Sequence, residues 1–243
     1  MRAKNIKRAA IILVCVLIVA GVLNLQVSIR QNIDGKTRRI TMPLYVKWIE
    51  FLSRHYEYDR IAKEVASSRR TDAEKALAIF KWTGDSIKKV PQGMPVVDDH
   101  IYNIIVRGYG TDSQSQDVFT TLCSYAHVPA FWERVYYNDR KSMFIMSFVK
   151  LNGKWAIFDS YNGTYFMTAD GKIATIDDMS GKDFGDSSYR GVPFSELKQE
   201  LERILNEKRT TRPEKQMPAR RIWFEIKKVL GIEKEDEKES GEV

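Results

Sequence analysis

One stretch, from Gly108 to Pro129, places the strongest constraint on how this chain folds. Its two glycines, Gly108 and Gly110, allow the positive φ values or the close chain approach of a tight turn. Asp112 stands where a helix N-cap is expected, and apolar residues follow it at helical spacing. These apolar residues are Val118, Leu122 and Tyr125. The stretch therefore predicts a glycine turn that leads directly into a buried helix, which ends before the proline.

The residues after this helix predict an antiparallel sheet. Segments 130–137, 142–151 and 154–160 are rich in aromatic and β-branched residues, as strands are. Asn152 and Gly153 form a hairpin turn signal between the last two segments. A central helix packed on an antiparallel sheet is an α+β arrangement, and this is the fold class that we predict.

The order of these motifs resembles the transglutaminase-like superfamily of papain-like cysteine enzymes. In that family a Gly-x-Gly-x-Cys motif enters a helix that ends in a phrase such as Ala-Gly-Ile-Pro-Ala, and here the helix ends Tyr125-Ala126-His127-Val128-Pro129-Ala130. A Gly-x-Trp turn and an aspartate follow in the family, as Gly153-Lys154-Trp155 and Asp159 do here. The family's preceding helix is similar to Ala76, Ile79, Trp82 and Ile87. The resemblance covers residues 71 to 160.

The resemblance implies a Cys-His-Asp triad, of which this chain keeps only the aspartate. Alignment by the glycines or by the proline places Asp112 at the nucleophile position, and counting back from Asp159 places Phe144 at the histidine. Asp112 suits a helix N-terminus electrostatically, but a carboxylate is a poor acyl nucleophile. We interpret Asp112 as a structural cap, with a direct chemical or binding role as the alternative. No confident catalytic residue is predicted, only the degenerate positions Asp112, Phe144 and Asp159.

Two active arrangements stay open at this point. Cys123 and His127 are four residues apart on the predicted helix, so they could form a thiol–imidazole pair oriented by Asp159. Their place near the helix C-terminus disfavours a thiolate. Asp112 and Asp159 could instead act together as a carboxylate acid/base pair.

The N-terminus predicts a membrane anchor. Residues 1–8 hold four basic side chains, and residues 9–23 contain no polar side chain other than Cys15. Apolar character continues weakly to residue 29, so we predict one transmembrane signal anchor over 9–29 that uses the lipid bilayer as its partner. A cleaved signal peptide is the alternative. The globular domain of such a single-pass protein would be periplasmic or extracellular.

The rest of the chain divides by composition. We predict a linker over 30–40, a transglutaminase-like domain over 41–205 and a second linker over 206–218. Within the domain, helices are expected over Leu44–Tyr58 and after the capping box Thr71–Glu74. A basic amphipathic helix over 219–231 and an acidic disordered tail over 232–243 complete the chain.

The C-terminal helix predicts a docking element. Trp223 and its apolar neighbours form one face over 219–230, and Arg220, Arg221, Lys227 and Lys228 border that face. Such a helix suits an anionic membrane surface or a protein partner. Packing of the helix back onto the domain is the alternative.

The charge distribution and the pattern of possible metal ligands argue against nucleic-acid binding and against metal sites. The net charge is +7, but residues 1–40 carry eight Lys or Arg against one Asp, so no nucleic-acid-binding face is indicated. The two cysteines match neither a disulfide nor a zinc spacing. Asp98-Asp99-His100 offers too few ligands for a metal, and the acidic loop 177–186 lacks the EF-hand order. We therefore predict no metal and no cofactor.

Together these features predict a membrane-anchored pseudoenzyme. The resemblance implies a binding or scaffold module of the bacterial cell envelope, with surface polysaccharide production as its setting by association. An active hydrolase or transferase with a relocated site, and an adaptor that works through its C-terminal helix, are the alternatives. The ligand is not predicted.

Overall fold

The computed structural model describes residues 2–98, 100–138, 140–180, 188–206 and 211–229. The predicted acidic tail over 232–243 lies outside these residues. The helices are α1 Arg2–Leu23, α2 Leu44–Ala66, α3 Asp72–Ser86, α4 Ile101–Arg107, α5 Asp112–Tyr125, α6 Phe194–Asn206 and α7 Pro218–Val229. The strands are β1 Gln26–Ile33, β2 Lys36–Pro43, β3 Lys88–Lys89, β4 Val97–Asp98, β5 Tyr109–Gly110, β6 Ala130–Tyr137, β7 Ser142–Leu151, β8 Lys154–Asp159, β9 Thr164–Tyr165, β10 Ser188–Tyr189 and β11 Val192–Pro193.

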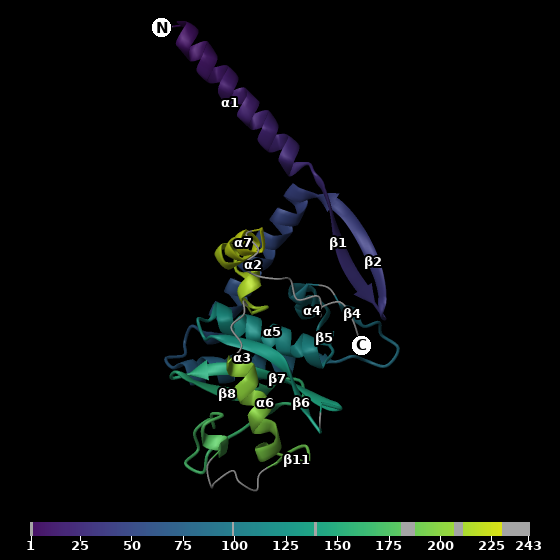
Figure 1. Ribbon diagram of the computed structural model, residues 1–243, viewed down its shortest axis with the longest axis vertical. Coiled ribbons are helices and arrows are strands. Elements are labelled where there is room, and N and C mark those ends of the chain that lie inside the picture. Colours follow the sequence, from purple (N-terminus) through teal and green to yellow (C-terminus); the bar gives the residue numbers. More distant parts are fainter. Residues whose placement is uncertain (1, 99, 139, 181–187, 207–210, 230–243) are drawn as a thin grey trace.

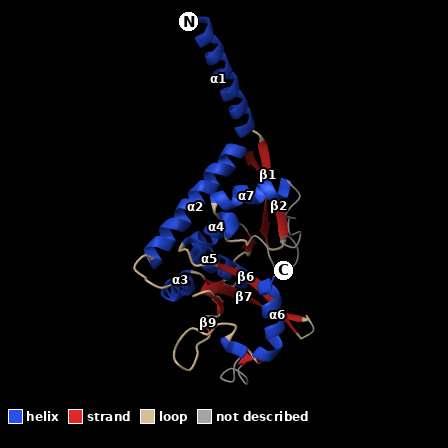
Figure 2. Cartoon of the chain, turned by 60° about the vertical axis from the view of Figure 1, so that its left-hand side comes forward, coloured by secondary structure: helices blue, strands red, loops and turns tan. Residues whose placement is uncertain are grey.

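The predicted α+β arrangement is present. Strands β6, β7, β8 and β9 form an antiparallel sheet in that order, and α5 lies against it (Figure 1). Because side chains alternate along a strand, each face of the sheet has its own hydrophobic core. Val149 and Phe158 pack with α2, α3 and α5, whereas Phe148 and Ile157 pack with α6. The sheet is therefore the middle of three layers (Figure 2).

Local sequence signals explain the helices that cover the first face. The capping box that starts α3 is formed, with Glu74 N donating to Thr71 Oγ1 at 3.2 Å and Thr71 N donating to Glu74 Oε2 at 3.1 Å. Helix α2 extends beyond its predicted end at Tyr58, because Tyr58 and the next turns are buried against the core. The Tyr58 hydroxyl accepts the Tyr102 backbone N–H at 2.9 Å, which ties α2 to α4.

The N-terminal segment corrects two expectations. Helix α1 ends at Leu23, so the predicted helical anchor does not continue to residue 29, and the predicted linker 30–40 lies in a β1–β2 hairpin. Apolar side chains at alternate positions favour strands here, and Asp34-Gly35 with positive φ at both residues is a hairpin turn. Within the described residues, no helix meets the length and apolarity required to cross a membrane.

The C-terminal segment corrects a third expectation, because the predicted linker 206–218 is partly docked on the domain. Arg212 Nη1 lies 3.3 Å from Asp117 Oδ2, and the Tyr125 hydroxyl donates to the Gln216 carbonyl at 2.9 Å. Met217 packs against the core on the α5 side. These contacts position the start of α7 beside the domain.

Helix α7 combines the two alternatives of the sequence analysis. Phe224 is 4% exposed, and Lys215 lies over its ring, so the helix packs against the docked segment 211–217 that precedes it. Ile222, Trp223 and Ile226 stay exposed, with Trp223 at 54%. A docking role for this exposed face remains a prediction.

We predict that Arg212→Ala lowers the unfolding free energy of the full chain in detergent by about 1–3 kcal/mol, because it removes a cation from the buried Asp117 carboxylate. Arg220→Ala is the matched control, since Arg220 is exposed and lies 4.0 Å from Glu214. This control should change stability by less than about 0.5 kcal/mol. Equal effects of the two variants in urea unfolding would contradict the assigned role of Arg212.

Candidate functional site

The glycine turn predicted from the sequence positions the start of α5. Gly108 ends α4 with φ +73, and the next two residues pair in parallel with β3. A Cβ at Gly110 would lie 3.0 Å from the Gln114 side chain, which is closer than an ordinary contact, so glycine favours the close approach of the turn to the helix. Thr111 is the N-cap, and its N–H donates to Gln114 Oε1 at 3.1 Å. The helix start is thus held by its own first turn.

Asp112 is the first residue of α5 and not its N-cap, which corrects the cap interpretation. The sequence analysis assigned the cap one residue late because Thr and Asp are both good caps and stand side by side. Burial and, to a smaller extent, the nearby Asp159 carboxylate raise the pKa of the Asp112 carboxyl to about 6, although a hydrogen bond from Gln116 acts in the opposite direction. Asp112 can therefore carry a proton at mildly acidic pH.

Gln116 lies at the centre of the site and is fully buried. Its Nε2 donates to Asp112 Oδ1 at 3.3 Å and to Asp159 Oδ1 at 3.1 Å, so one amide bridges the two carboxylates. Its Oε1 accepts from Ser147 Oγ at 2.6 Å and from Ser160 Oγ at 3.0 Å. The amide orientation is fixed at both ends by these partners.

Sequence reasoning missed Gln116, because a glutamine inside a helix carries no motif. The signal available was its spacing. Gln116 follows Asp112 by four residues, so the two side chains lie on one helix face, next to the end of the strand that carries Asp159.

Asp159 ends β8 and lies beside the N-terminal part of α5. Its carboxylate accepts the Tyr161 N–H at 3.1 Å, the Asn162 N–H at 3.0 Å and Asn162 Nδ2 at 2.8 Å. The Tyr189 hydroxyl also donates to it. Backbone and side-chain donors of Tyr161, Asn162 and Tyr189 hold this carboxylate in one orientation.

Phe144 lies on the other face of the sheet. Its ring stacks on Tyr137 with centroids 4.5 Å apart and meets Tyr189 edge-on at 4.9 Å, within the core that α6 covers. The β7 side chain that reaches Gln116 is Ser147. Phe144 contacts neighbours of the carboxylate pair, because its ring meets Tyr189 and the Arg190 guanidinium lies 5.9 Å from its centroid.

The Cys123/His127 arrangement is wrong. Cys123 is fully buried, and burial raises the pKa of its thiol far above its usual range. Helix α5 ends at Tyr125, and His127 is exposed with φ +63, so the two residues do not share a helix face. Both lie at the opposite end of α5 from Asp112 and Gln116.

Two cations form the rim of the site. Lys89 Nζ lies 4.7 Å from the centroid of the Tyr161 ring and 3.4 Å from Asn162 Oδ1. Arg190 follows Tyr189 and is exposed. Both cations act to lower the pKa of Asp112, against the effect of burial. The site thus combines a carboxyl that can carry a proton, a fixed carboxylate and two exposed cations.

The acidic motifs of the sequence analysis contribute no metal site to the described part of the chain. No group of three His, Cys, Asp or Glu there could hold a metal ion. Asp99 lies outside the described residues, as do residues 181–186 of the acidic loop. Asp178 in the described part of that loop accepts hydrogen bonds from Thr175 N and Oγ1, which closes a turn.

Three solved structures are similar to part of the chain. One is described as a "putative protease" from Parabacteroides distasonis (16% identity, TM-score 0.37, covering 42% of this chain and 23% of that one). Another is described as a "putative cysteine protease" from Cytophaga hutchinsonii (19% identity, TM-score 0.38, covering 55% of this chain and 45% of that one). The third is described as a TGase (12% identity, TM-score 0.36, covering 68% of this chain and 49% of that one).

The chain spans less than half the length of each of these structures. No family model matches the chain, and no curated protein matches it. The assignment of the fold therefore rests on the arrangement of α5 against the sheet β6–β9, which is the arrangement that the sequence resemblance implied.

We predict that Asp112 makes the protein less stable as pH rises from about 4 to above 6. Its pKa is higher in the folded chain than the ordinary 3.8, so the folded state binds the proton more tightly and loses that advantage on ionisation. A shift of this size corresponds to about 3 kcal/mol, which solvent screening of a half-buried carboxyl reduces to about 1 kcal/mol.

Asp112→Asn should remove this part of the pH dependence. We expect the variant to gain about 1 kcal/mol relative to the wild type between pH 4.5 and pH 7.5, measured by urea unfolding of the full chain in detergent. Asp170→Asn, at an exposed acidic residue, is the control. A difference between variant and wild type that is the same at both pH values would contradict the assignment.

We predict that Gln116→Met lowers the unfolding free energy by about 2–4 kcal/mol, because it leaves several buried hydroxyl and carboxylate groups without their amide partner. Gln199→Met, at an exposed position on α6, should change stability by less than about 0.5 kcal/mol. Thermal unfolding of both variants is the measurement. Equal melting temperatures of Gln116→Met and Gln199→Met would contradict the structural role of the Gln116 amide.

Proposed function

We propose that the chain is a membrane-anchored binding module with a transglutaminase-like core that performs no acyl transfer. The observation that carries this proposal is the Asp112–Gln116–Asp159 cluster at the N-terminus of α5. A thiolate mechanism needs a thiol and an imidazole at this place. The described contacts of the three residues include neither group.

The chemistry of the cluster supports a polar, hydroxyl-rich ligand. Carboxylate and amide groups hydrogen-bond to hydroxyls in fixed directions, and the Tyr161 ring beside Lys89 offers an aromatic surface. A surface polysaccharide of a bacterial cell envelope has this chemistry. We propose such a glycan as the ligand class.

Helix α1 is the proposed anchor. Its apolar side chains are exposed around the helix, from Ile11 at 63% to Val22 at 48%, and a helix that is apolar on all sides needs an apolar environment. In this proposal a lipid bilayer surrounds α1, and the globular domain lies outside the cytoplasm. The exposed face of α7 is a further proposed contact with an anionic membrane surface or a protein partner.

A second candidate is a hydrolase that uses the two carboxylates. The raised pKa of Asp112 beside Asp159 favours it, because one carboxyl that carries a proton near a fixed carboxylate is the usual requirement for acid/base catalysis. The Asp159 carboxylate already accepts hydrogen bonds from Gln116 and from backbone N–H groups, so its oxygens are less available to react with a substrate. This favours binding over catalysis.

We predict that the full chain in detergent shows no amine incorporation into a glutamine donor and no peptidase activity. Neither reaction has a nucleophile at the N-terminus of α5. Turnover that iodoacetamide abolishes would contradict the proposal, because it requires an accessible catalytic thiol.

Binding and cleavage of envelope glycans by the full chain, measured between pH 4 and pH 8, distinguish the binding module from the hydrolase. Binding without cleavage supports the binding module, and Asp112→Asn should weaken it while Asp170→Asn leaves it unchanged. Cleavage that disappears in Asp112→Asn would favour the hydrolase.

A further inference from the structure

The β1–β2 hairpin carries a pair of like charges that directly oppose each other. The register of the two strands places Arg30 opposite Arg39, and both side chains are exposed. Within the described residues, neither arginine takes part in an ion pair. Like charges directly opposite in a sheet destabilise it. The hairpin therefore maintains an unfavourable contact that an anion would relieve.

The face around this pair consists of uncharged hydrogen-bonding groups. Alternation places Ser28, Asn32, Thr37 and Thr41 on the same face as the two arginines. Ser28 Oγ and Thr41 Oγ1 lie 3.5 Å apart, and Thr37 Oγ1 donates to Asn32 Oδ1 at 2.6 Å. The acidic residue of the hairpin, Asp34, is in the turn, where its Oδ1 accepts the Val96 N–H at 2.8 Å.

Both ends of the hairpin lie at the end of α1. Leu44 N, at the start of α2, donates to the Leu25 carbonyl at 2.8 Å, so the chain returns to the point where it left α1 (Figure 1). Arg30 is four residues beyond Gln26, which is about 13 Å along a strand. If α1 lies in a bilayer, the arginine pair lies close to the headgroup layer, and long basic side chains can extend towards it.

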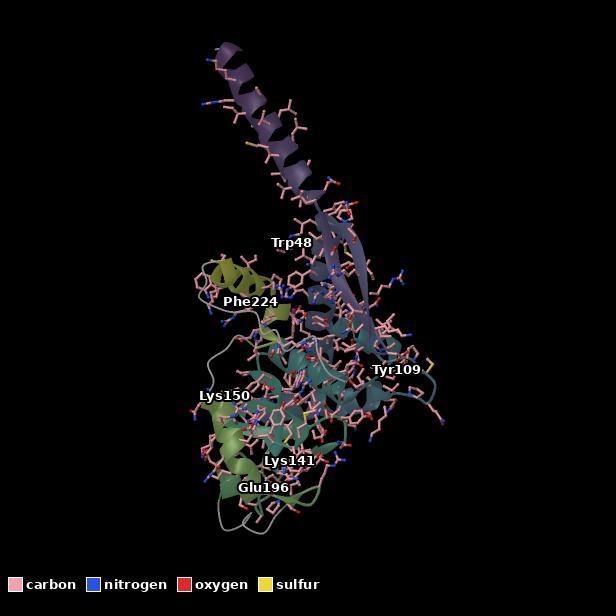
Figure 3. All side chains as sticks on the ribbon, turned by 45° about the vertical axis from the view of Figure 1, so that its right-hand side comes forward. Trp48, Tyr109, Lys141, Lys150, Glu196 and Phe224 are labelled. Carbon is pink, nitrogen blue, oxygen red and sulfur yellow. The ribbon has the colours of Figure 1, made fainter. Side chains whose placement is uncertain are left out.

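The start of α2 adds the side chains that favour a membrane interface. Tyr45, Trp48 and Ile49 are exposed there, and Trp48 lies on the part of the molecule nearest α1 (Figure 3). Tyr and Trp concentrate where hydrocarbon meets headgroups. The charge is distributed in the same way, because residues beyond 40 contain 31 basic and 31 acidic side chains, and the excess positive charge belongs to residues 1–40.

We infer that the Arg30–Arg39 face binds the phosphate headgroups of anionic phospholipids in the bilayer that holds α1. Guanidinium groups bind phosphate with paired hydrogen bonds, and the hydroxyls beside them add donors. The phosphate charge relieves the repulsion between the two arginines. The inference rests on the membrane anchoring proposed above and adds lipid selectivity and an orientation of the hairpin at the surface.

The test uses the full chain in nanodiscs of equal phosphatidylglycerol and phosphatidylcholine, with native mass spectrometry of the lipids retained on release. Wild-type protein should retain phosphatidylglycerol preferentially. Arg30→Gln/Arg39→Gln should lower this preference by about fivefold or more, the effect of one basic side chain near an anionic surface at low salt. The same variant should melt at an equal or higher temperature, because the repulsion is gone.

Two further variants make the result specific. Arg30→Lys/Arg39→Lys keeps the charges and should keep most of the preference. Lys81→Gln/Lys141→Gln removes the same charge from α3 and from the turn between β6 and β7, away from α1, and should behave as wild type (Figures 1 and 3). If Arg30→Gln/Arg39→Gln melts normally and retains the wild-type preference, the inference is overturned.

Other outcomes separate this inference from the proposals on which it rests. A chain that floats with neither neutral nor anionic vesicles overturns the anchoring and this inference with it. A chain that floats with both but shows no lipid preference overturns this inference alone. Binding of inorganic phosphate to the chain in detergent, together with no lipid preference in the bilayer, assigns the arginine pair to a soluble phosphate ligand and overturns lipid binding.

Discussion

The Gln116 amide is the contact on which the rest of the site depends. It joins the N-terminal turn of α5 to the end of β8 through Asp112 and Asp159, and it joins the same helix to β7 through Ser147. A buried amide that satisfies donors and acceptors on both sides fixes the relative positions of the elements that carry them, because any displacement leaves buried polar groups unpaired. The helix and sheet are thus aligned by hydrogen bonds at this end and by apolar packing along the rest of α5.

This alignment also determines the electrostatics at the start of α5. The N-terminus of a buried helix favours an anion, and Asp112 occupies that place. Burial and the neighbouring carboxylate oppose its ionisation, so its pKa is raised to about 6. The result is a carboxyl that can carry a proton beside a carboxylate that several hydrogen-bond donors hold in place.

Contacts near both ends of the chain position the helices that lie outside the central sheet. The β1–β2 hairpin returns the chain to the end of α1, so α2 starts there and extends into the core. At the other end, Arg212 and Gln216 attach the chain to α5 before α7 begins. Helices α2 and α7 and the β1–β2 hairpin consequently lie on the part of the molecule from which α1 extends (Figure 2), and they carry exposed side chains such as Trp48, Trp223 and Arg30.

The sequence by itself determined the elements that depend on local chemistry. The capping box of α3, the Gly108–Gly110 turn, the core helix and the Asn-Gly hairpin follow from short-range preferences, and the motif spacing placed Asp112 and Asp159 at one site. Even the first hairpin had a local signal, Asp34-Gly35, but apolar residues at alternate positions after α1 resembled the weakening end of an anchor.

Only the tertiary structure decided which side chains meet. Gln116, Ser147 and Tyr189 belong to separate elements, and no local pattern marks them. Counting residues placed Phe144 near the site, whereas the strand alternation placed it on the opposite face of the sheet, because one residue of register exchanges the two faces. The docking of residues 211–217 likewise depends on the buried Asp117, whose requirement for a cation becomes visible only once the core has formed around it.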